Sequence, residues 1–410
     1  MSKESVDVLI IGAGPSGCVS AAYLISNGVD VKIIEKSKFP RYVIGESLLP
    51  RCMDHFEEVG LLDCLKAANF ETKKGARFLR NKSICNFDFS KKHFEEGWDW
   101  TWQVPRDTFD DVLAKEVQKK GVVIDFESTV TNVVFDGSNS ETTVLDKDGN
   151  KKVISAKFII DSSGYGRVLP RILNLDKESN LPKHSSIFTQ VKDSKRPKGE
   201  EGTLISFDIL ETEVWLWVIP FSNGNTSIGF VGPTEFINSF EGTPKERIRK
   251  MLKLSSYFDN RFSDLEYLFT PIIIQNFSKS VKQLYGDGYA LTGNSSEFLD
   301  PVFSSGVAFA TESGLLAAKL AVRELKNELV DWEKEYTEYI AHGVAVFRTY
   351  VDEWYSGNLQ ELFFHQPENP EIKKQICSVL AGYVWDKTNP FVTKHKRIIK
   401  SVAHLIKNSI

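Results

Sequence analysis

The sequence has little cysteine, little net charge and no long apolar run, and each shortage excludes a class of protein. Five cysteines are scattered over 410 residues without C-x-x-C spacing, so they indicate reduced thiols, and we expect neither a disulfide framework nor a metal site. A net charge of −4 predicts no general affinity for nucleic acid. No apolar run approaches the ~20 residues that a membrane-spanning helix needs. Because the first residues lead directly into an apolar strand pattern, we expect no signal peptide and a cytoplasmic protein.

Internal repeats and low-complexity segments are also absent from the sequence. The composition, 41% hydrophobic and 26% charged, is ordinary for a globular protein. At about 100 to 200 residues per domain, the length predicts two or three domains with a large core.

One β-α-β unit, Val6 to Lys36, is the clearest positive signal. An apolar run of strand length leads into a G-x-G-x-x-G loop, whose glycines allow a tight turn, close approach of a pyrophosphate and packing of the next helix. The second strand ends in an acid, which binds ribose hydroxyls and repels a 2′-phosphate. The alternative is a purely structural turn. The spacing favours a dinucleotide such as FAD or NAD, held by Gly12, Gly14, Pro15, Ser16, Gly17, Glu35 and Lys36.

Two later segments return to the same edge of the predicted sheet. Strands end at Asp161 and at Gly293-Asn294, and the second is followed by Asp300-Pro301 and a small-residue loop that opens a helix. Acidic and small residues at the carboxyl ends of strands lie where an α/β sheet receives its ligand, and a helix N-terminus attracts anions. Between them, aromatic and β-branched residues alternate from about 185 to 275, which predicts an inserted sheet.

Several segments resemble the flavin-dependent halogenases and their relatives among FAD monooxygenases and reductases. They are Gly45-Glu46-Ser47-Leu48-Leu49-Pro50, Phe70 to Phe78, the R-x-x-F-D sequence from Arg106, and the W-x-W-x-I-P sequence from Trp215 to Pro220. The resemblance implies an α/β fold with a glutathione-reductase-type FAD-binding Rossmann domain, an inserted antiparallel β-sheet substrate domain and a C-terminal helical region. The corresponding ranges are 1–184 and 285–330 for the FAD-binding domain, 185–284 for the substrate domain and 331–410 for the helical region.

The resemblance also assigns roles near the flavin. The cofactor is FAD, used as FADH2, and the reaction consumes chloride or bromide. The implied cofactor contacts beyond the first unit are Gly45, Glu46, Ser47, Arg106, Asp161, Gly293, Asn294, Asp300, Pro301, Gly306 and Val307. The halide would lie at Ser305 and Gly306.

The catalytic residues implied by the resemblance are Lys73, Trp215, Trp217, Ile219 and Pro220. Two indoles between flavin and substrate would block direct oxygen transfer. A halogenase needs such a barrier, whereas a hydroxylase must avoid it. Read without the resemblance, two lysines before a glycine are more often a solvated turn, and paired tryptophans are often core packing. The neighbouring Lys74 leaves the register of the active lysine open.

We therefore hypothesise a halogenase that makes hypohalous acid from FADH2, O2 and halide and relays it to Lys73 beside an electron-rich aromatic ring. Phe303 stands where tryptophan-specific halogenases carry a glutamate, which favours a phenol or pyrrole. A second G-x-G-x-x-G is absent, which favours a separate NAD(P)H-dependent flavin reductase. The alternatives are a FAD-dependent aromatic monooxygenase, a reductase of prenyl or other double bonds, and a flavin-bearing sensor. The sequence leaves open whether the substrate is free or bound to an acyl carrier, and which halide is preferred.

The C-terminal stretch from Thr393 to Lys407 is basic and contains no acid. On a helix, one apolar stripe would be formed by Ile398, Ile399, Val402, Leu405 and Ile406. The simpler interpretation is a terminal helix that packs this stripe on its own domain. The alternative is a docking face for an acidic carrier protein or for a membrane surface.

Overall fold

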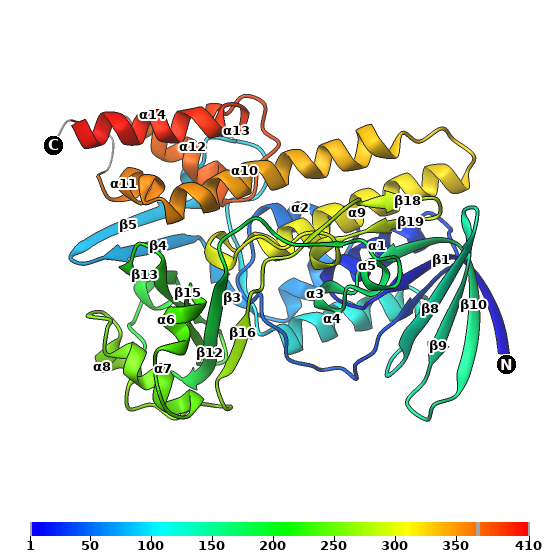
Figure 1. Cartoon of the computed structure of the whole chain (residues 1–410), viewed down its shortest axis with the longest axis horizontal. Coiled ribbons are helices and arrows are strands. Elements are labelled where there is room, and N and C mark those ends of the chain that lie inside the picture. Colours follow the sequence, from blue (N-terminus) through cyan, green and yellow to red (C-terminus); the bar gives the residue numbers. More distant parts are fainter. Residues whose placement is uncertain (1, 366–369, 409–410) are drawn as a thin grey trace.

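The computed structural model describes residues 2–365 and 370–408. Two large sheets lie side by side, and the C-terminal helices run across the top of both in the view of Figure 1. This arrangement places the ends of several distant segments together at the centre of the molecule.

The first sheet is the dinucleotide-binding sheet that the sequence predicts. Its parallel strands are β19 (Tyr289–Leu291), β10 (Lys151–Asp161), β1 (Ser2–Ile11), β2 (Val31–Ile34) and β7 (Val123–Asp125), in this spatial order. The central strands are apolar because helices and the hairpin at residues 129–145 cover them. Antiparallel additions are β18 (Tyr285–Gly286), β8 (Thr129–Asp136) and β9 (Asn139–Leu145).

Helix α1 (Pro15–Ser26) packs tightly against the long helix α9 (Ser305–Leu325). The contact needs a glycine, because a Cβ on Gly314 would lie 2.6 Å from Ser16 Oγ. At the same contact, the Ser20 hydroxyl donates to the Gly314 carbonyl oxygen at 2.9 Å. The middle of α9 is therefore held beside the first turns of α1, although Ser20 and Gly314 are 294 positions apart in the sequence.

The second sheet is built from distant parts of the chain. Its order is β16 (Ile272–Gln275), β12 (His184–Lys192), β15 (Asn225–Pro233), β14 (Val214–Pro220), β13 (Ile205–Glu211), β4 (Gly75–Arg80) and β5 (Ser83–Asp88). The β13–β4 pair is parallel, so the sheet that was expected to be antiparallel is mixed. Two of its strands, β4 and β5, thus come from the part of the chain between the glycine-rich loop and Asp161. A separate two-stranded ladder joins β3 (Glu71–Lys73) to β6 (Thr101–Gln103), and another joins β11 (Asp176–Lys177) to β17 (Ser280–Val281).

The remaining helices surround the sheets. They are α2 (Arg51–Glu58), α3 (Leu62–Ala67), α4 (Arg106–Lys119), α5 (Val168–Ile172), α6 (Thr234–Asn238), α7 (Pro244–Leu252), α8 (Asp259–Phe262), α10 (Glu338–Tyr355), α11 (Asn358–Phe364), α12 (Pro370–Leu380), α13 (Pro390–Thr393) and α14 (His395–Asn408). Within residues 2–365 and 370–408, none of the helices combines the length and apolar character needed to cross a membrane. The prediction of a Rossmann-type FAD-binding fold with an inserted sheet is confirmed.

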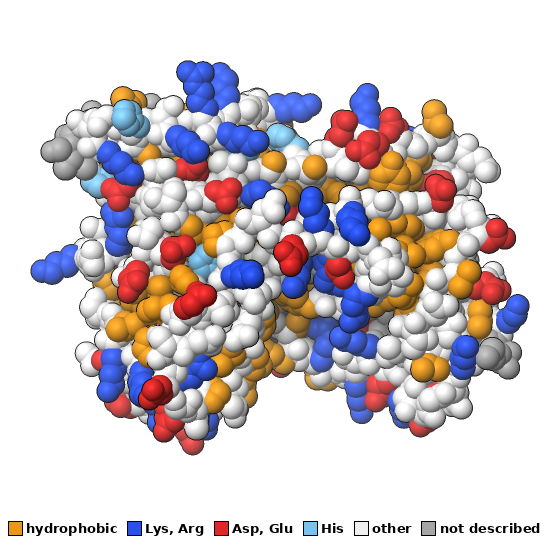
Figure 2. All heavy atoms as spheres, in the orientation of Figure 1, with side chains coloured by type: hydrophobic (Ala, Val, Ile, Leu, Met, Phe, Trp, Pro, Cys, Tyr) orange, Lys and Arg blue, Asp and Glu red, His pale blue; other side chains and the backbone are white. Residues whose placement is uncertain are grey.

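Helix α14 packs on α10 and α11, as the simpler interpretation of the C-terminus predicts. Ile399 and Ala403 are fully buried, whereas Leu405 is 65% exposed. The buried line is therefore i, i+4, and the predicted stripe was wrong at Leu405. The charged side chains of α14 lie in solvent, where Figure 2 shows a cluster of basic residues along the top of the molecule.

Candidate functional site

The loop between β1 and α1 has the geometry that its three glycines predict. Gly12 has a φ of +104°, and a Cβ there would lie 2.5 Å from the Ser162 carbonyl oxygen. A Cβ on Gly17 would lie 2.0 Å from the Gly12 carbonyl oxygen, so this glycine lets α1 pack against the loop. A Cβ on Gly14 would meet nothing closer than Arg41 Nη2, at 3.8 Å. Gly14 faces a cavity, so the second glycine leaves room for a ligand.

This cavity has a volume of about 480 Å³ and runs from the glycine-rich loop to the second sheet. Its size falls within the range of about 300 to 1,000 Å³ that is usual for cofactor and small-molecule sites. The predicted site residues on its wall are Gly12, Gly14, Pro15, Ser16, Glu35, Lys36, Gly45, Glu46, Ser47, Arg106, Trp215, Trp217, Ile219, Gly293, Asn294, Pro301, Gly306 and Val307. Those that are not on the wall are Gly17, Lys73, Asp161, Pro220, Asp300 and Ser305.

Two acids predicted at the cofactor are held by the backbone in different ways. Glu35 is on the cavity wall and accepts hydrogen bonds from Ala13 N and Ser37 N, both at 2.9 Å, which fixes its carboxylate in place. Asp161 is buried behind the wall, where it accepts from Ser163 N at 2.8 Å and from Leu169 N at 2.7 Å. Glu35 can therefore face ribose hydroxyls, whereas Asp161 shapes the turn after β10.

Three hydroxyl groups join the three segments that reach the cavity. Ser16 Oγ lies 2.8 Å from Thr292 Oγ1, Ser162 Oγ lies 2.8 Å from the same atom, and the two serine oxygens are 3.2 Å apart. Ser16 follows β1, Ser162 follows β10 and Thr292 follows β19. This cluster holds the loops in register around the cavity, and no local sequence signal identified it.

Arg106 fixes the loop at the opposite side of the cavity. Its guanidinium pairs with Asp110 at 2.8 Å and donates to the carbonyl oxygens of Ile44 and Gly45 at 3.0 and 3.2 Å. Gly45 has a φ of +111°, and a Cβ there would lie 2.8 Å from Arg106 Nη1. Glycine at this position lets the loop approach the guanidinium closely.

Glu46 is a buried acid on the cavity wall, with 1% of its surface exposed. Gln190 Nε2 donates to its Oε1 at 2.8 Å, and the Tyr42 hydroxyl lies 3.3 Å from the same oxygen. Burial raises the pKa of Glu46 to about 7, against hydrogen bonds from Ser227, Gln190 and Tyr42 that lower it. Among the described residues, its Oε2 has no hydrogen-bond partner. The side chain can therefore gain or lose a proton at the cavity near neutral pH.

Trp215 and Trp217 alternate along β14 and form part of the cavity wall. Both are buried, with ring centroids 6.1 Å apart, and Ile219 continues the same face. Trp217 Nε1 donates to Ser227 Oγ at 3.1 Å. Pro220 ends the strand outside the wall. Part of the cavity wall is thus aromatic and belongs to the second sheet.

Lys73 is buried outside the cavity, and only 2% of it is exposed. Its Nζ donates to the Leu48 carbonyl oxygen at 2.8 Å and lies 5.6 Å from the centre of the Phe89 ring. Burial lowers the pKa of Lys73 to about 7, with a small opposing effect from Cys52. Lys74, the next residue, is exposed because successive side chains of an extended chain point to opposite sides. The structure therefore distinguishes Lys73, which is buried, from Lys74, which is exposed, whereas the sequence left the choice between them open.

The start of α9 forms another part of the cavity wall. Ser304 has a φ of +56°, a left-handed conformation that redirects the chain into the helix. Gly306 borders the main cavity and also a second hollow of about 20 Å³, on whose wall Ser305 lies. The partial positive charge of a helix N-terminus makes this a favourable place for an anion.

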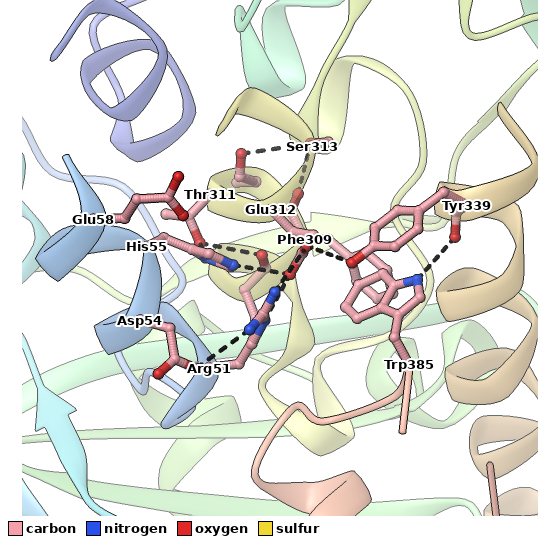
Figure 3. Close-up of polar contacts among 12 residues, drawn as sticks. Arg51, Asp54, His55, Glu58, Phe309, Thr311, Glu312, Ser313, Tyr339 and Trp385 are labelled. Atoms are coloured by element: carbon pink, nitrogen blue, oxygen red, sulfur yellow. Dashed lines mark hydrogen bonds and ion pairs between the residues drawn. The ribbon is translucent and has the colours of Figure 1, made fainter. Parts of the chain in front are cut away.

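A buried ionic cluster, which the sequence did not reveal, joins α2 to α9 (Figure 3). Glu312 accepts from Arg51 Nε at 2.8 Å, its Oε2 lies 2.8 Å from His55 Nε2, and the Tyr339 hydroxyl donates to it at 2.8 Å. Burial raises the pKa of Glu312, but His55 and Arg51 together lower it by more. The pKa of Glu312 therefore lies well below its usual value. The helical spacing of Arg51 and His55 is a weak signal for such a cluster, and their partner is more than 250 residues away.

Comparisons with known proteins agree with this geometry. A family model described as FAD binding domain matches residues 5–248. The 1H-pyrrole-2-carbonyl-(peptidyl-carrier protein) brominase of Pseudoalteromonas luteoviolacea (strain 2ta16) is 27% identical and covers 93% of both chains. A flavoprotein/dehydrogenase of Cytophaga hutchinsonii is 52% identical, with a TM-score of 0.97 over 99% of this chain and 100% of that one. A flavin-dependent brominase structure is 25% identical, with a TM-score of 0.85 over 99% of this chain and 100% of that one.

Proposed function

The chain belongs to the FAD-binding domain family, and we propose that within it the protein is a halogenase of electron-rich aromatic rings. The observation that carries the proposal is the placement of Lys73. It is a buried amine outside the cofactor cavity, and Trp215 and Trp217 form part of the cavity wall. A hydroxylase has no use for either feature, because its oxygen must pass directly from flavin to substrate.

The residues on the cavity wall fit FAD. Gly14 leaves room for the pyrophosphate, Glu35 faces the ribose, and Arg106 with Gly45 to Ser47 and Gly293 would surround the flavin. Bound as FADH2, the cofactor supplies two of the four electrons that reduce O2, and the halide supplies the other two, which gives hypohalous acid and water. The N-terminus of α9 at Ser305 and Gly306 would hold the chloride or bromide ion.

Lys73 would receive the hypohalous acid, either by hydrogen bond or as a haloamine. Its buried position favours both roles, since a lowered pKa makes the lone pair available near neutral pH. The aromatic ring then attacks the halogen, and the ring proton is lost. The protein contributes separation, orientation and dryness, because the tryptophan wall keeps the cofactor and the ring apart.

The substrate is proposed to be a phenol or pyrrole, either free or bound to a carrier protein. Phe303 is a buried hydrocarbon side chain, so it offers no charge to activate a less reactive ring. The Pseudoalteromonas relative acts on a pyrrole held by a peptidyl-carrier protein. Carrier proteins are acidic partners, and the exposed basic side chains of α14 would complement such a surface. The same basic helix would also be the part of the protein that contacts a membrane surface.

A separate NAD(P)H-dependent flavin reductase is the proposed source of FADH2. The proposal is supported by the single glycine-rich dinucleotide loop in the sequence. All five cysteines are free thiols in the structure, which supports a reducing, cytoplasmic location.

The test is to supply the purified protein with photoreduced FAD, bromide and a panel of phenols and pyrroles, and to measure the product masses. We expect the mass of one bromine in place of one hydrogen. A gain of oxygen would assign a monooxygenase, a gain of two hydrogens would assign a double-bond reductase, and no product from free or carrier-bound rings would leave a binding protein.

A further inference from the structure

A continuous hydrogen-bonded chain links the tryptophan wall to the loop before α9. Trp215 Nε1 lies 3.2 Å from the Tyr355 hydroxyl, and this hydroxyl lies 2.9 Å from Asp300 Oδ2. Trp215 comes from β14, Tyr355 from the last turn of α10, and Asp300 immediately precedes the short helical turn Pro301–Phe303. All three are buried, so water does not compete for these contacts.

The direction of the chain follows from the donors available. An indole nitrogen can only donate, so the Tyr355 oxygen accepts from Trp215 and its own hydrogen must go to Asp300. The other carboxylate oxygen, Oδ1, accepts from Val302 N at 2.9 Å. Both oxygens of Asp300 therefore act as acceptors, and the polarity runs one way from the wall to the loop.

Asp300 transmits this contact to the cofactor side. Its side chain caps the short helical turn Pro301–Phe303, which leads through Ser304 into α9. Pro301 and Ser304 border the cofactor cavity. On the other side, the ring of Tyr355 is stacked on His184 at 4.2 Å, which restricts its rotation.

We propose that Tyr355 is a positioning residue that holds Trp215 in place against the loop before α9 and so keeps the wall closed between the cofactor and Lys73. The consequence for catalysis rests on the proposed function, whereas the tether itself does not. Loss of the tether leaves the cofactor site intact but loosens the wall, so hypohalous acid escapes instead of reaching the amine.

The tether is tested first in protein without FAD or halide, by proton–nitrogen NMR of the tryptophan indoles. The Trp215 signal is assigned by its loss in Trp215→Phe. In Tyr355→Phe we expect this signal to move upfield and its hydrogen exchange to accelerate about tenfold, the value of one hydrogen bond. The other indole signals report whether the variant is folded.

Tyr350→Phe is the matched control, because Tyr350 is a buried tyrosine on the same helix whose hydroxyl has no hydrogen-bond partner among the described residues. It should leave the Trp215 signal unchanged. Asp300→Asn provides a second variant, because a neutral amide oxygen attracts the Tyr355 proton less strongly, and the Trp215 signal should move in the same direction. An unchanged Trp215 signal in both Tyr355→Phe and Asp300→Asn would overturn the tether.

The catalytic consequence is measured as a ratio. With photoreduced FAD and bromide, Tyr355→Phe should consume O2 at the wild-type rate but release several-fold more hypobromous acid to an added trap and form correspondingly less product. An unchanged ratio would contradict the positioning role even if the NMR signal moves. If the wild-type protein forms no halogenated product at all but the Trp215 signal moves in Tyr355→Phe, the proposed function is removed and the tether is kept.

Discussion

The cofactor cavity and the surroundings of Lys73 are built in opposite ways. At the glycine-rich loop, the cavity is lined by glycines, hydroxyls and backbone groups that follow strand ends, and it has room for a polar ligand. Lys73 is buried beside the Phe89 ring, and its Nζ donates a hydrogen bond to the Leu48 carbonyl oxygen. The contrast indicates that the cofactor and the amine need different surroundings. Polar groups hold the phosphates of the cofactor, whereas a dry environment keeps the amine uncharged.

The largest expected effect is a loss of FAD binding that leaves the surroundings of Lys73 unchanged. In Gly14→Val, a branched side chain fills the space left for the pyrophosphate, and the cost of overpacking predicts a loss of FAD affinity of about 10- to 100-fold or more. The yellow colour should be lost on gel filtration while the circular dichroism spectrum is kept. The control is Ser26→Val at the exposed end of the same helix, which should keep FAD. Retained FAD in Gly14→Val would show that this loop is not the dinucleotide site.

The next largest effect is expected at the buried ionic cluster that joins α2 to α9. Glu312→Gln leaves Arg51 and His55 without their carboxylate, and we expect unfolding to cost roughly 3 kcal/mol less, because breaking a buried ion pair strands the remaining charge. Glu58→Gln is the matched control, since Glu58 pairs with Lys319 across the same helices in a more exposed position. That change should cost less than about 1 kcal/mol. Equal losses in urea denaturation would contradict a special role for the buried cluster.

The dryness around Lys73 predicts a pH dependence of stability. The unfolded chain binds a proton at Lys73 up to its usual pKa of 10.5, whereas the folded chain releases it at about 7, so the unfolded state holds more protons between these values. Stability should therefore rise with pH in this window, by on the order of 1 kcal/mol per pH unit from this group. Lys73→Met should lack this rise, as measured by denaturation at pH 7 and pH 9. Parallel curves for wild type and Lys73→Met would mean that Lys73 is hydrated.

The smallest effect concerns the outer surface. If a carrier protein docks on α14, the rate with a carrier-bound substrate should fall as ionic strength rises from about 0.05 to 0.3 M, because salt screens exposed charges. Lys400 pairs with Glu353 at 3.4 Å, so Lys396→Glu with Arg397→Glu is the cleaner charge reversal. The rate with a free substrate is the control. A salt-independent rate, unaffected by the double change, would leave α14 a structural helix.

Local sequence patterns indicate the cofactor site, whereas contacts between distant strands and helices leave no such pattern. The glycine-rich loop, Glu35 and the strand ends are signalled locally, because each role needs a particular residue within a few positions of a strand. The pairing of β13 with β4 could not be predicted, because β-pairing between distant strands leaves no local pattern. The same holds for the contact of Glu312 with His55 and for the Trp215–Tyr355–Asp300 chain.

The central claim is that Lys73 acts at the substrate end and not at the flavin, and the most direct test compares Lys73→Met with Lys74→Met. Methionine keeps the volume of the buried side chain, so the fold and FAD binding should be unchanged in both variants. With photoreduced FAD, bromide and the best substrate, Lys73→Met should release hypobromous acid at the wild-type rate and form no halogenated product, while Lys74→Met should behave as wild type. Normal product formation by Lys73→Met, or loss of product only in Lys74→Met, would contradict the account.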